Sequence, residues 1–127
     1  MRNNTEKEEK LLLIPKVEKY IEYVIGIIIK LPRTEKFSIG TEYKTSMYQM
    51  ISNVMILNKI NKNERKEIIS ILNNIDASLN TQRIYLRIMK KERWMDEKKF
   101  NIAMEQIYEI GKILGGTIKY YAKNNKE

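Results

Sequence analysis

Histidine and cysteine, the side chains that most often act as bases, nucleophiles and zinc ligands, are absent from this chain of 127 residues. The missing cysteine excludes disulfide bonds, zinc fingers and thiol nucleophiles. The missing histidine excludes the Ser-His-Asp triad and the HExxH metal site. Carboxylates or a lysine could still do chemistry, but Asp76 has no second carboxylate at the three-residue spacing of a di-iron bundle. We therefore expect a protein that is not an enzyme and uses no cofactor and no metal.

Basic side chains are the groups that remain for recognition. Lysine and arginine total 24, and aspartate and glutamate total 16, so the net charge is +8 and the pI is near 9.6. Residues 81–127 hold 11 of the basic residues and six of the acidic ones. Such an excess favours a polyanionic partner, either a nucleic acid or an anionic membrane surface.

Part of this charge follows helical spacing. Arg83 and Arg87 are four residues apart, Lys90 and Lys91 continue on that side, and Arg93 follows in a loop. A stripe of this kind could follow a phosphate backbone, and its binding would weaken steeply as the salt concentration rises. The alternative is an ordinary solvated helix face.

Three glycines occur within six positions near the end of the chain: Gly111, Gly115 and Gly116. Each costs a helix about 0.8–1 kcal/mol relative to alanine, so some other interaction should compensate. The favoured interpretation is close packing against another backbone, either within the bundle or across a subunit contact, because Gly111 and Gly115 share one helix face. Two alternatives stay open: a loop that binds phosphate through its amides, and a double glycine that ends the helix.

Several single residues also have two interpretations. Trp94 either stacks on a base or closes the end of a bundle. Asp76 either pairs with a basic residue of another helix or lies on the surface. Tyr20, Tyr43 and Tyr121 fall on apolar positions and are expected in the core. The tyrosines expected at an interface or surface are Tyr23, Tyr85 and Tyr120.

The elements that position these residues are four helices. Residues 1–10 are expected to form a flexible polar lead-in. The first helix then has an apolar seam with alternating steps of four and three, and further isoleucines widen it, so it should lie in the core or face a second chain. A β-strand over residues 24–29 is the alternative. The seam consists of Leu13, Val17, Tyr20, Val24, Ile27 and Leu31.

Pro32 should end this helix, Ser38 should cap the next, and Phe37 should pack on the next helix as a hydrophobic staple. A third helix should start near Glu64, and Asp96 should cap the fourth. Their seams are Ile39, Tyr43, Met47, Met50, Val54 and Leu57; Ile68, Leu72, Ile75, Leu79, Gln82, Leu86 and Met89; and Phe100, Ala103, Ile107, Ile110, Leu114, Ile118 and Tyr121. One polar residue, Gln82, interrupts the second of these seams.

With short connections, these segments predict an all-α, up-down-up-down four-helix bundle over residues 11–124. The longest apolar run is far shorter than the roughly 20 residues of a membrane span, and the polar N-terminus does not resemble a secretory signal. We therefore expect a cytoplasmic protein. Binding of the basic face to an anionic membrane surface remains a further hypothesis.

Three motifs resemble those of the accessory variability determinant family of diversity-generating retroelements. Lys30-Leu-Pro-Arg-Thr-Glu-Lys-Phe-Ser-Ile-Gly40 is similar to the family's K-F-P-R-x-x-R-F-x-L-G. Residues 75–87 resemble its D-x-x-L-x-x-L-R-x-x-L-R segment, and residues 109–119 its closing E-I-G-R-M-L-G-G-W-I-K. The chain departs from the family at Gln82, usually leucine, and at Thr117, usually tryptophan.

This resemblance implies a homopentameric barrel of four-helix bundles without enzymatic activity. It also implies binding to the element's reverse transcriptase and to RNA or DNA during mutagenic retrohoming. Arg83 and Arg87 are the residues that match the family motif, and Lys90, Lys91, Arg93, Lys112 and Lys119 are weaker additions to the expected surface. The alternative is a structural bundle of the kind encoded in ribosomal-RNA intervening sequences, with no defined activity.

Overall fold

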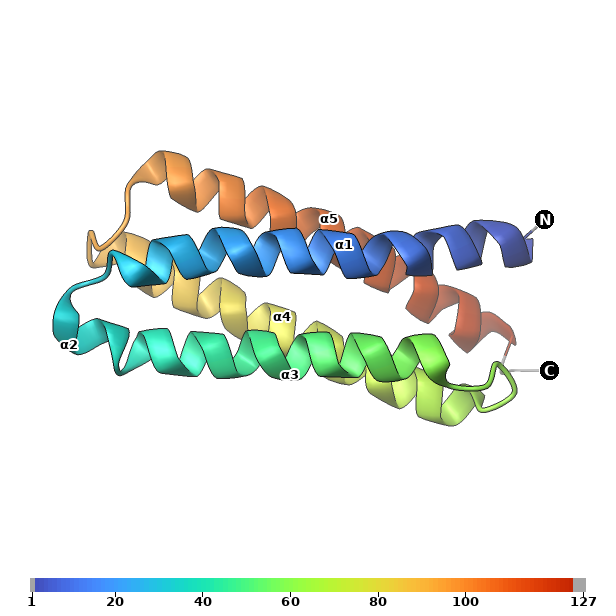
Figure 1. Cartoon of the computed structure of the whole chain (residues 1–127). Helices are drawn as coiled ribbons and strands as arrows, with labels where there is room; N and C mark the ends of the chain where they lie inside the picture. Colours follow the sequence, from blue (N-terminus) through green and yellow to red (C-terminus); the bar gives the residue numbers. More distant parts are fainter. Residues whose placement is uncertain (1, 125–127) are drawn as a thin grey trace.

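The computed structural model describes the backbone of residues 2–124 and the side chains of residues 12–123. Met1 and residues 125–127, parts of the expected lead-in and polar tail, lie outside the described residues. The described chain forms the long helices α1 (Arg2–Ile29), α3 (Ile39–Lys59), α4 (Arg65–Lys91) and α5 (Glu97–Asn124), with a single helical turn, α2 (Arg33–Lys36), between the first two. The long helices alternate in direction, and both ends of the described chain lie at the same end of the molecule (Figure 1).

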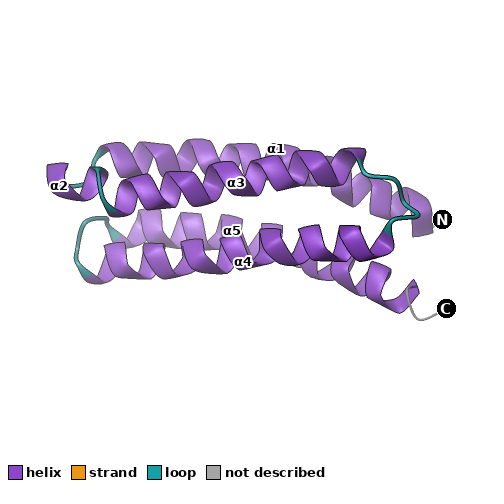
Figure 2. Cartoon of the chain, turned by 90° about the horizontal axis from the view of Figure 1, so that it is seen from below, coloured by secondary structure: helices purple, strands orange, loops and turns teal. Residues whose placement is uncertain are grey.

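The long helices form a ring of four neighbours. α1 packs against α3 and α5, and α4 packs against the same two helices. Figure 2 shows the same arrangement as two layers, with α1 and α3 in one and α5 and α4 in the other. This arrangement confirms the predicted up-down-up-down four-helix bundle.

Helix α1 differs from the expectation at its start. Its backbone is helical from Arg2, so the helix begins within the stretch that the sequence assigns to a lead-in. Glutamate and lysine, which favour helices, fill much of that stretch. Pro15 lies inside the helix, where it removes one backbone hydrogen bond and its ring crowds the carbonyl four residues earlier. The strand alternative for residues 24–29 is wrong, because α1 continues to Ile29.

The connection between α1 and α3 confirms one prediction and corrects two. Pro32 follows the end of α1 and precedes α2. Ser38 precedes α3 as expected but makes no side-chain cap; its hydroxyl instead donates a hydrogen bond to Glu35 Oε1 at 3.2 Å. The predicted staple is wrong, because Phe37 follows α2 as its C-cap and its side chain is 76% exposed.

The heptad seams form the core. All the predicted seam positions of α1 and α4 are buried, while Ile39 and Phe100, at the starts of α3 and α5, are only half-buried. In α5 the prediction slips by one residue, because Thr117 is buried and Ile118 is half-buried. Thr117 can occupy the seam because its hydroxyl donates to the Ile113 carbonyl at 2.8 Å.

A chain of buried hydrogen bonds connects α1, α3 and α4 at the centre of this core. The Tyr20 hydroxyl donates to Gln82 Oε1 at 2.8 Å, and the Gln82 amide donates to Ser46 Oγ at 3.1 Å. Because Tyr20 has one hydroxyl proton, the Tyr43 hydroxyl must donate to the Tyr20 oxygen, 2.7 Å away. The network explains how an apolar seam tolerates a fully buried glutamine, since a buried polar group is costly only when it lacks a partner.

Candidate nucleic-acid interface

Helix α4 brings the basic stripe to the side of the bundle that faces α5. Its seam residues Leu79, Gln82 and Leu86 are buried, so the flanking positions Arg83 and Lys90 lie beside the core and are half-buried. Arg87 and Lys91 are exposed. Two of these cations, Lys90 and Lys91, lie in the last turn of α4, where positive charge is stabilised by the helix dipole.

Arg83 crosses from α4 onto the backbone of α5. A Cβ added to Gly111 would lie 3.2 Å from Arg83 Nη2 and 3.8 Å from Leu79 Cδ2. Arg83 also donates a hydrogen bond to Asn80 Oδ1 on its own helix. Gly111 is therefore closely packed, but against the side chains of Arg83 and Leu79 and not against another backbone as predicted, and a larger residue would press on the guanidinium. The Arg83 guanidinium therefore lies at the α4–α5 surface.

Gly115 and Gly116 behave differently from Gly111. Both are exposed, and a Cβ added to Gly115 would meet nothing within 4 Å, so the predicted packing is wrong for Gly115 within this chain. Helix α5 continues to Asn124, so the double glycine does not end it. The phosphate-loop alternative is also wrong, because the amides in the middle of a helix are bonded to its own carbonyls.

Lys90 is directed onto the start of α5. Its Nζ lies 4.5 Å from the centre of the Phe100 ring and 3.5 Å from Glu97 Oε1. A cation that already contacts an aromatic ring and a carboxylate would have to give up these contacts in order to bind a phosphate. Lys90 is consequently a weaker candidate for nucleic-acid contact than the exposed Arg87.

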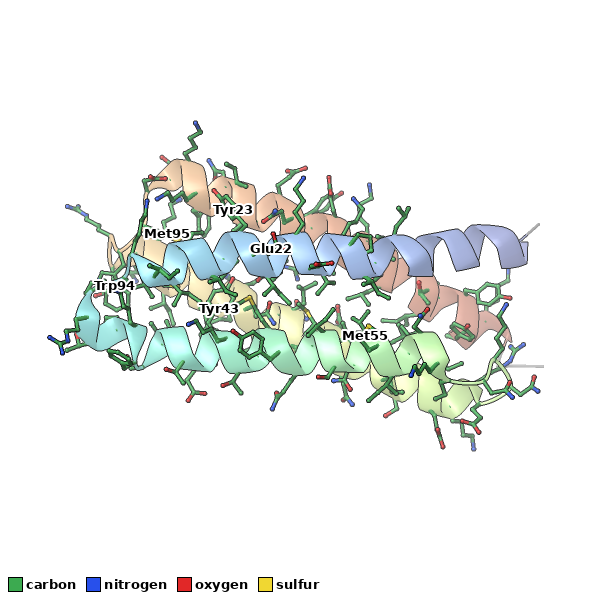
Figure 3. The ribbon with its side chains drawn as sticks, viewed as in Figure 1. Glu22, Tyr23, Tyr43, Met55, Trp94 and Met95 are labelled. Atoms are coloured by element: carbon green, nitrogen blue, oxygen red, sulfur yellow. The ribbon has the colours of Figure 1, made fainter. Side chains whose placement is uncertain are left out.

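The connection between α4 and α5 positions Arg93 and Trp94. Arg93 has a left-handed backbone, with φ of 64°, and an exposed side chain. The Trp94 amide donates to the Met89 carbonyl at 2.9 Å, and its half-buried side chain packs against the core. Figure 3 shows Trp94 and Met95 at the end of the bundle where the connection containing α2 also lies. These contacts support the interpretation that Trp94 closes the bundle.

Helix α5 contributes Lys112 and Lys119, both exposed. Lys112 Nζ lies 5.6 Å from the centre of the Tyr108 ring, which is 58% exposed. Sequence reasoning missed Tyr108 as a surface aromatic, although its place beside the seam residue Ile107 was a usable signal. The tyrosines that were expected at the surface, Tyr23, Tyr85 and Tyr120, are all half-buried.

Asp76 is half-buried and accepts a hydrogen bond from Asn80 Nδ2 at 3.4 Å, within its own helix. A spacing of seven residues separates Asp76 from Arg83 and Arg83 from Lys90. The three side chains therefore share one side of α4 and form one row toward α5. The structure thus places three of the predicted cations, Arg83, Arg87 and Lys90, on or beside the α4–α5 surface. Lys91 and Arg93 lie near the α4–α5 connection, and Lys112 and Lys119 lie along α5.

Two further findings concern the residues that the structure describes. None of their helices is both long enough and apolar enough to cross a membrane. Among them, no group of three or more acidic side chains is arranged to hold a metal ion.

Comparison with protein-family models matches residues 11–121 to the bAvd-like family. A search of curated proteins finds no match to this chain. The matched range includes all three motifs that resemble the accessory variability determinant family, and nearly all of the four-helix bundle. The chain therefore belongs to the bAvd-like family.

Proposed function

We propose that this protein is a non-enzymatic accessory factor of a diversity-generating retroelement, acting in the cytoplasm with the element's reverse transcriptase and nucleic acid. The observation that carries the proposal is the family match over residues 11–121. Family membership supports the accessory role, and the basic side chains along α4 and α5 support the nucleic-acid partner, RNA or DNA.

The α4–α5 surface is the proposed contact with the phosphate backbone. Arg87 and Lys91 of α4 and Lys112 and Lys119 of α5 are exposed, and the Arg83 guanidinium lies against Gly111 at the junction of the two helices. Arg93 extends the surface into the α4–α5 connection. A surface that reads phosphates in this way binds without strong sequence preference.

Binding measured against salt concentration tests this surface. We expect the double variant Arg83→Ala/Arg87→Ala to weaken binding to single-stranded RNA and DNA, and to reduce the slope of log K against log salt by about 0.7 for each phosphate that is no longer neutralised. Lys66→Ala is the control, because Lys66 is an exposed cation near the other end of the same helix. Absence of binding by the wild type to either nucleic acid at low salt would contradict the proposal.

The same double variant tests the enzyme partner. The wild-type protein should co-purify with the reverse transcriptase of its own element, and the amount of enzyme that the double variant retains shows whether the enzyme contacts this surface in addition to the nucleic acid. A gene neighbourhood without a reverse transcriptase and a variable repeat would instead favour the structural bundle of ribosomal-RNA intervening sequences.

Homo-oligomerisation, expected as a pentamer, is the remaining part of the proposal. Helix α1 supports it, because Leu12 and Ile29 are more than half exposed, and Ile14, Ile21 and Ile25 are only half-buried. An apolar excess of this kind is typical of a helix that packs against a second chain. Light scattering should give the mass of five copies, and a monomer at micromolar concentration would contradict this part.

A further inference from the structure

The outer surface between α3 and α4 is a groove without cations. It runs along both helices, and its two sections share Thr45, Gln49, Ala77 and Ser78. Residues 45–58 include no charged residue, and residues 68–82 include only Asp76, which lies on the α5 side of α4. Charged residues make up 31% of the whole chain, so a neutral outer surface across two helices needs an explanation.

The groove presents amide groups with unused hydrogen-bonding capacity. Gln49, Asn53 and Asn74 line it, and none of their side chains bonds to another residue that the structure describes. Each amide offers both donors and acceptors. Tyr48, which lines the groove and is 48% exposed, adds a large amphipathic surface. Tyrosine is enriched among the residues that contribute most to protein–protein affinity.

These features match a polypeptide partner better than a nucleic acid. A phosphate backbone needs cations, and the only charged residue that lines the two sections is Glu42, an acid. Peptide groups both donate and accept, as the groove amides do. The cores of protein–protein interfaces are also depleted in charged residues.

A second copy of this chain fits another face better. Permanent contacts between copies are strongly apolar, and a more apolar groove lies between α1 and α3, lined by Ile14, Ile21, Ile51 and Met55 together with Glu18 and Glu22. Figure 3 shows Met55 of α3 and Glu22 of α1 on this face. The neutral α3–α4 groove has the polar composition of an interface with a separate protein.

We propose that the α3–α4 groove is the docking surface for the protein partner, so that the reverse transcriptase and the nucleic acid bind on opposite sides of α4. This inference rests on the proposed function, because that proposal supplies the reverse transcriptase as the partner. The occupant is a neutral helix or loop of the enzyme that hydrogen-bonds with the groove amides and packs against Tyr48.

The experiment places a charge in the middle of the groove. Ala77 is exposed and lines both sections, and arginine and glutamate both favour helices, so Ala77→Arg and Ala77→Glu should preserve the fold. We expect each variant to reduce the co-purified reverse transcriptase by about tenfold, as disruption at the centre of an interface does. Ala122→Arg and Ala122→Glu, on the exposed end of α5, are the matched controls and should retain the enzyme.

Each other outcome overturns the inference in a recognisable way. Retention of the enzyme by both Ala77 variants would show that the groove is not its docking surface. Tighter RNA binding by Ala77→Arg and weaker binding by Ala77→Glu, with the enzyme retained, would assign the groove to nucleic acid. A change of mass in light scattering would assign it to a second copy. Failure of the wild type to retain the enzyme would instead contradict the proposed function, and the inference would be lost with it.

Discussion

The two sides of α4 differ in chemistry although one apolar seam supports both. Toward α5 the flanking positions from residue 76 onward are Asp76, Arg83 and Lys90, each charged. Toward α3 the positions at the same spacing include Ser78 and Tyr85, which are uncharged. The Ser78 carbonyl accepts a hydrogen bond from the Ser46 hydroxyl at 3.4 Å, and the centre of the Tyr85 ring lies 5.6 Å from that of Tyr43. A heptad seam therefore fixes which positions flank the core but leaves their chemistry free. In this chain the two flanks are proposed to serve different partners.

The largest expected effect on stability comes from a substitution in the apolar seam of α4, which supports both sides of the helix. Leu79 is fully buried between them, so Leu79→Ala should lower the free energy of unfolding by about 2–5 kcal/mol through reduced burial and the cavity left behind. Urea denaturation measures this change. Ile84→Ala is the control on the same helix, because Ile84 is an exposed side chain and should change stability by less than about 1 kcal/mol. Equal costs for the two variants would contradict the role of Leu79 in the core.

The next effect concerns the hydrogen-bond network behind the α3 side. Tyr20→Phe leaves Gln82 Oε1 and the Tyr43 hydroxyl without their present partner, so it should cost about 1–3 kcal/mol at neutral pH. Tyr48→Phe, at an exposed tyrosine, is the matched control and should cost almost nothing. A Tyr20→Phe variant as stable as the wild type would show that the network contributes little to stability.

The network also predicts a dependence on alkaline pH. Burial raises the pKa of Tyr20 and of Tyr43 above the usual value near 10, and the Arg83 guanidinium offsets part of the increase at Tyr20. Because the unfolded phenols ionise near pH 10 and the folded ones do not, their contribution is complete below about pH 10 and is lost as the pH rises. Each buried phenol should cost about 1.4 kcal/mol per pH unit there.

Urea denaturation between pH 8 and 11 would measure this slope. Tyr20→Phe should lose stability less steeply above about pH 10 than the wild type, because it has one buried phenol fewer to ionise on unfolding. Tyr48→Phe should keep the wild-type slope. Equal slopes for the two variants would show that ionisation of Tyr20 does not control alkaline unfolding.

The sequence predicts the seams well because burial follows a period that can be counted. The sequence predicts the bundle and the Asp96 cap, and the Lys99 amide donates to Asp96 Oδ1 at 2.8 Å. Gln82, which the pattern gives only as a polar interruption of the seam, is fully buried. The errors fall where one side chain has two local options. Ser38 bonds to Glu35 instead of capping α3, and Thr117 replaces Ile118 in the seam.

The candidate surface was only partly predictable for a related reason. Helical spacing places Arg83 and Lys90 on one side of α4, but it does not indicate what lies opposite them. Only the fold shows that Arg83 packs on Gly111 and that Lys90 contacts Phe100 and Glu97. The neutral groove was missed because a run without charges is conspicuous only after two helices place their runs side by side.

A smaller effect on stability is expected when each of two glycines of α5 is replaced by alanine. Gly115→Ala should stabilise the fold by about 0.8–1 kcal/mol, because alanine favours the helix and its Cβ meets open space. Gly111→Ala should gain less, because its Cβ would displace the Arg83 guanidinium at the α4–α5 surface. Thermal unfolding of both variants measures the difference. A larger gain at Gly111 would show that Arg83 moves away freely and is not held by this contact.

The smallest expected effect is the coupling energy of two ion pairs, one on each side of α5. Lys16 of α1 lies 3.0 Å from Glu109, and Lys90 of α4 lies 3.5 Å from Glu97, whose side chain is the more exposed of the two carboxylates. Double-mutant cycles with alanine should give about 0.2–1 kcal/mol for the first pair and less for the second.

Measurements at high salt distinguish the contribution of charge from that of packing in the Lys16–Glu109 and Lys90–Phe100 contacts. In 1 M NaCl the screening length falls to about 3 Å, so the coupling between Lys16 and Glu109 should nearly disappear. The contact between Lys90 and the Phe100 ring should persist in a Lys90–Phe100 cycle, because part of it is packing of the lysine stem. A Lys90–Phe100 coupling that disappears with salt would mean that this contact is held by charge alone. Lys90 would then be available to a phosphate whenever Glu97 is displaced.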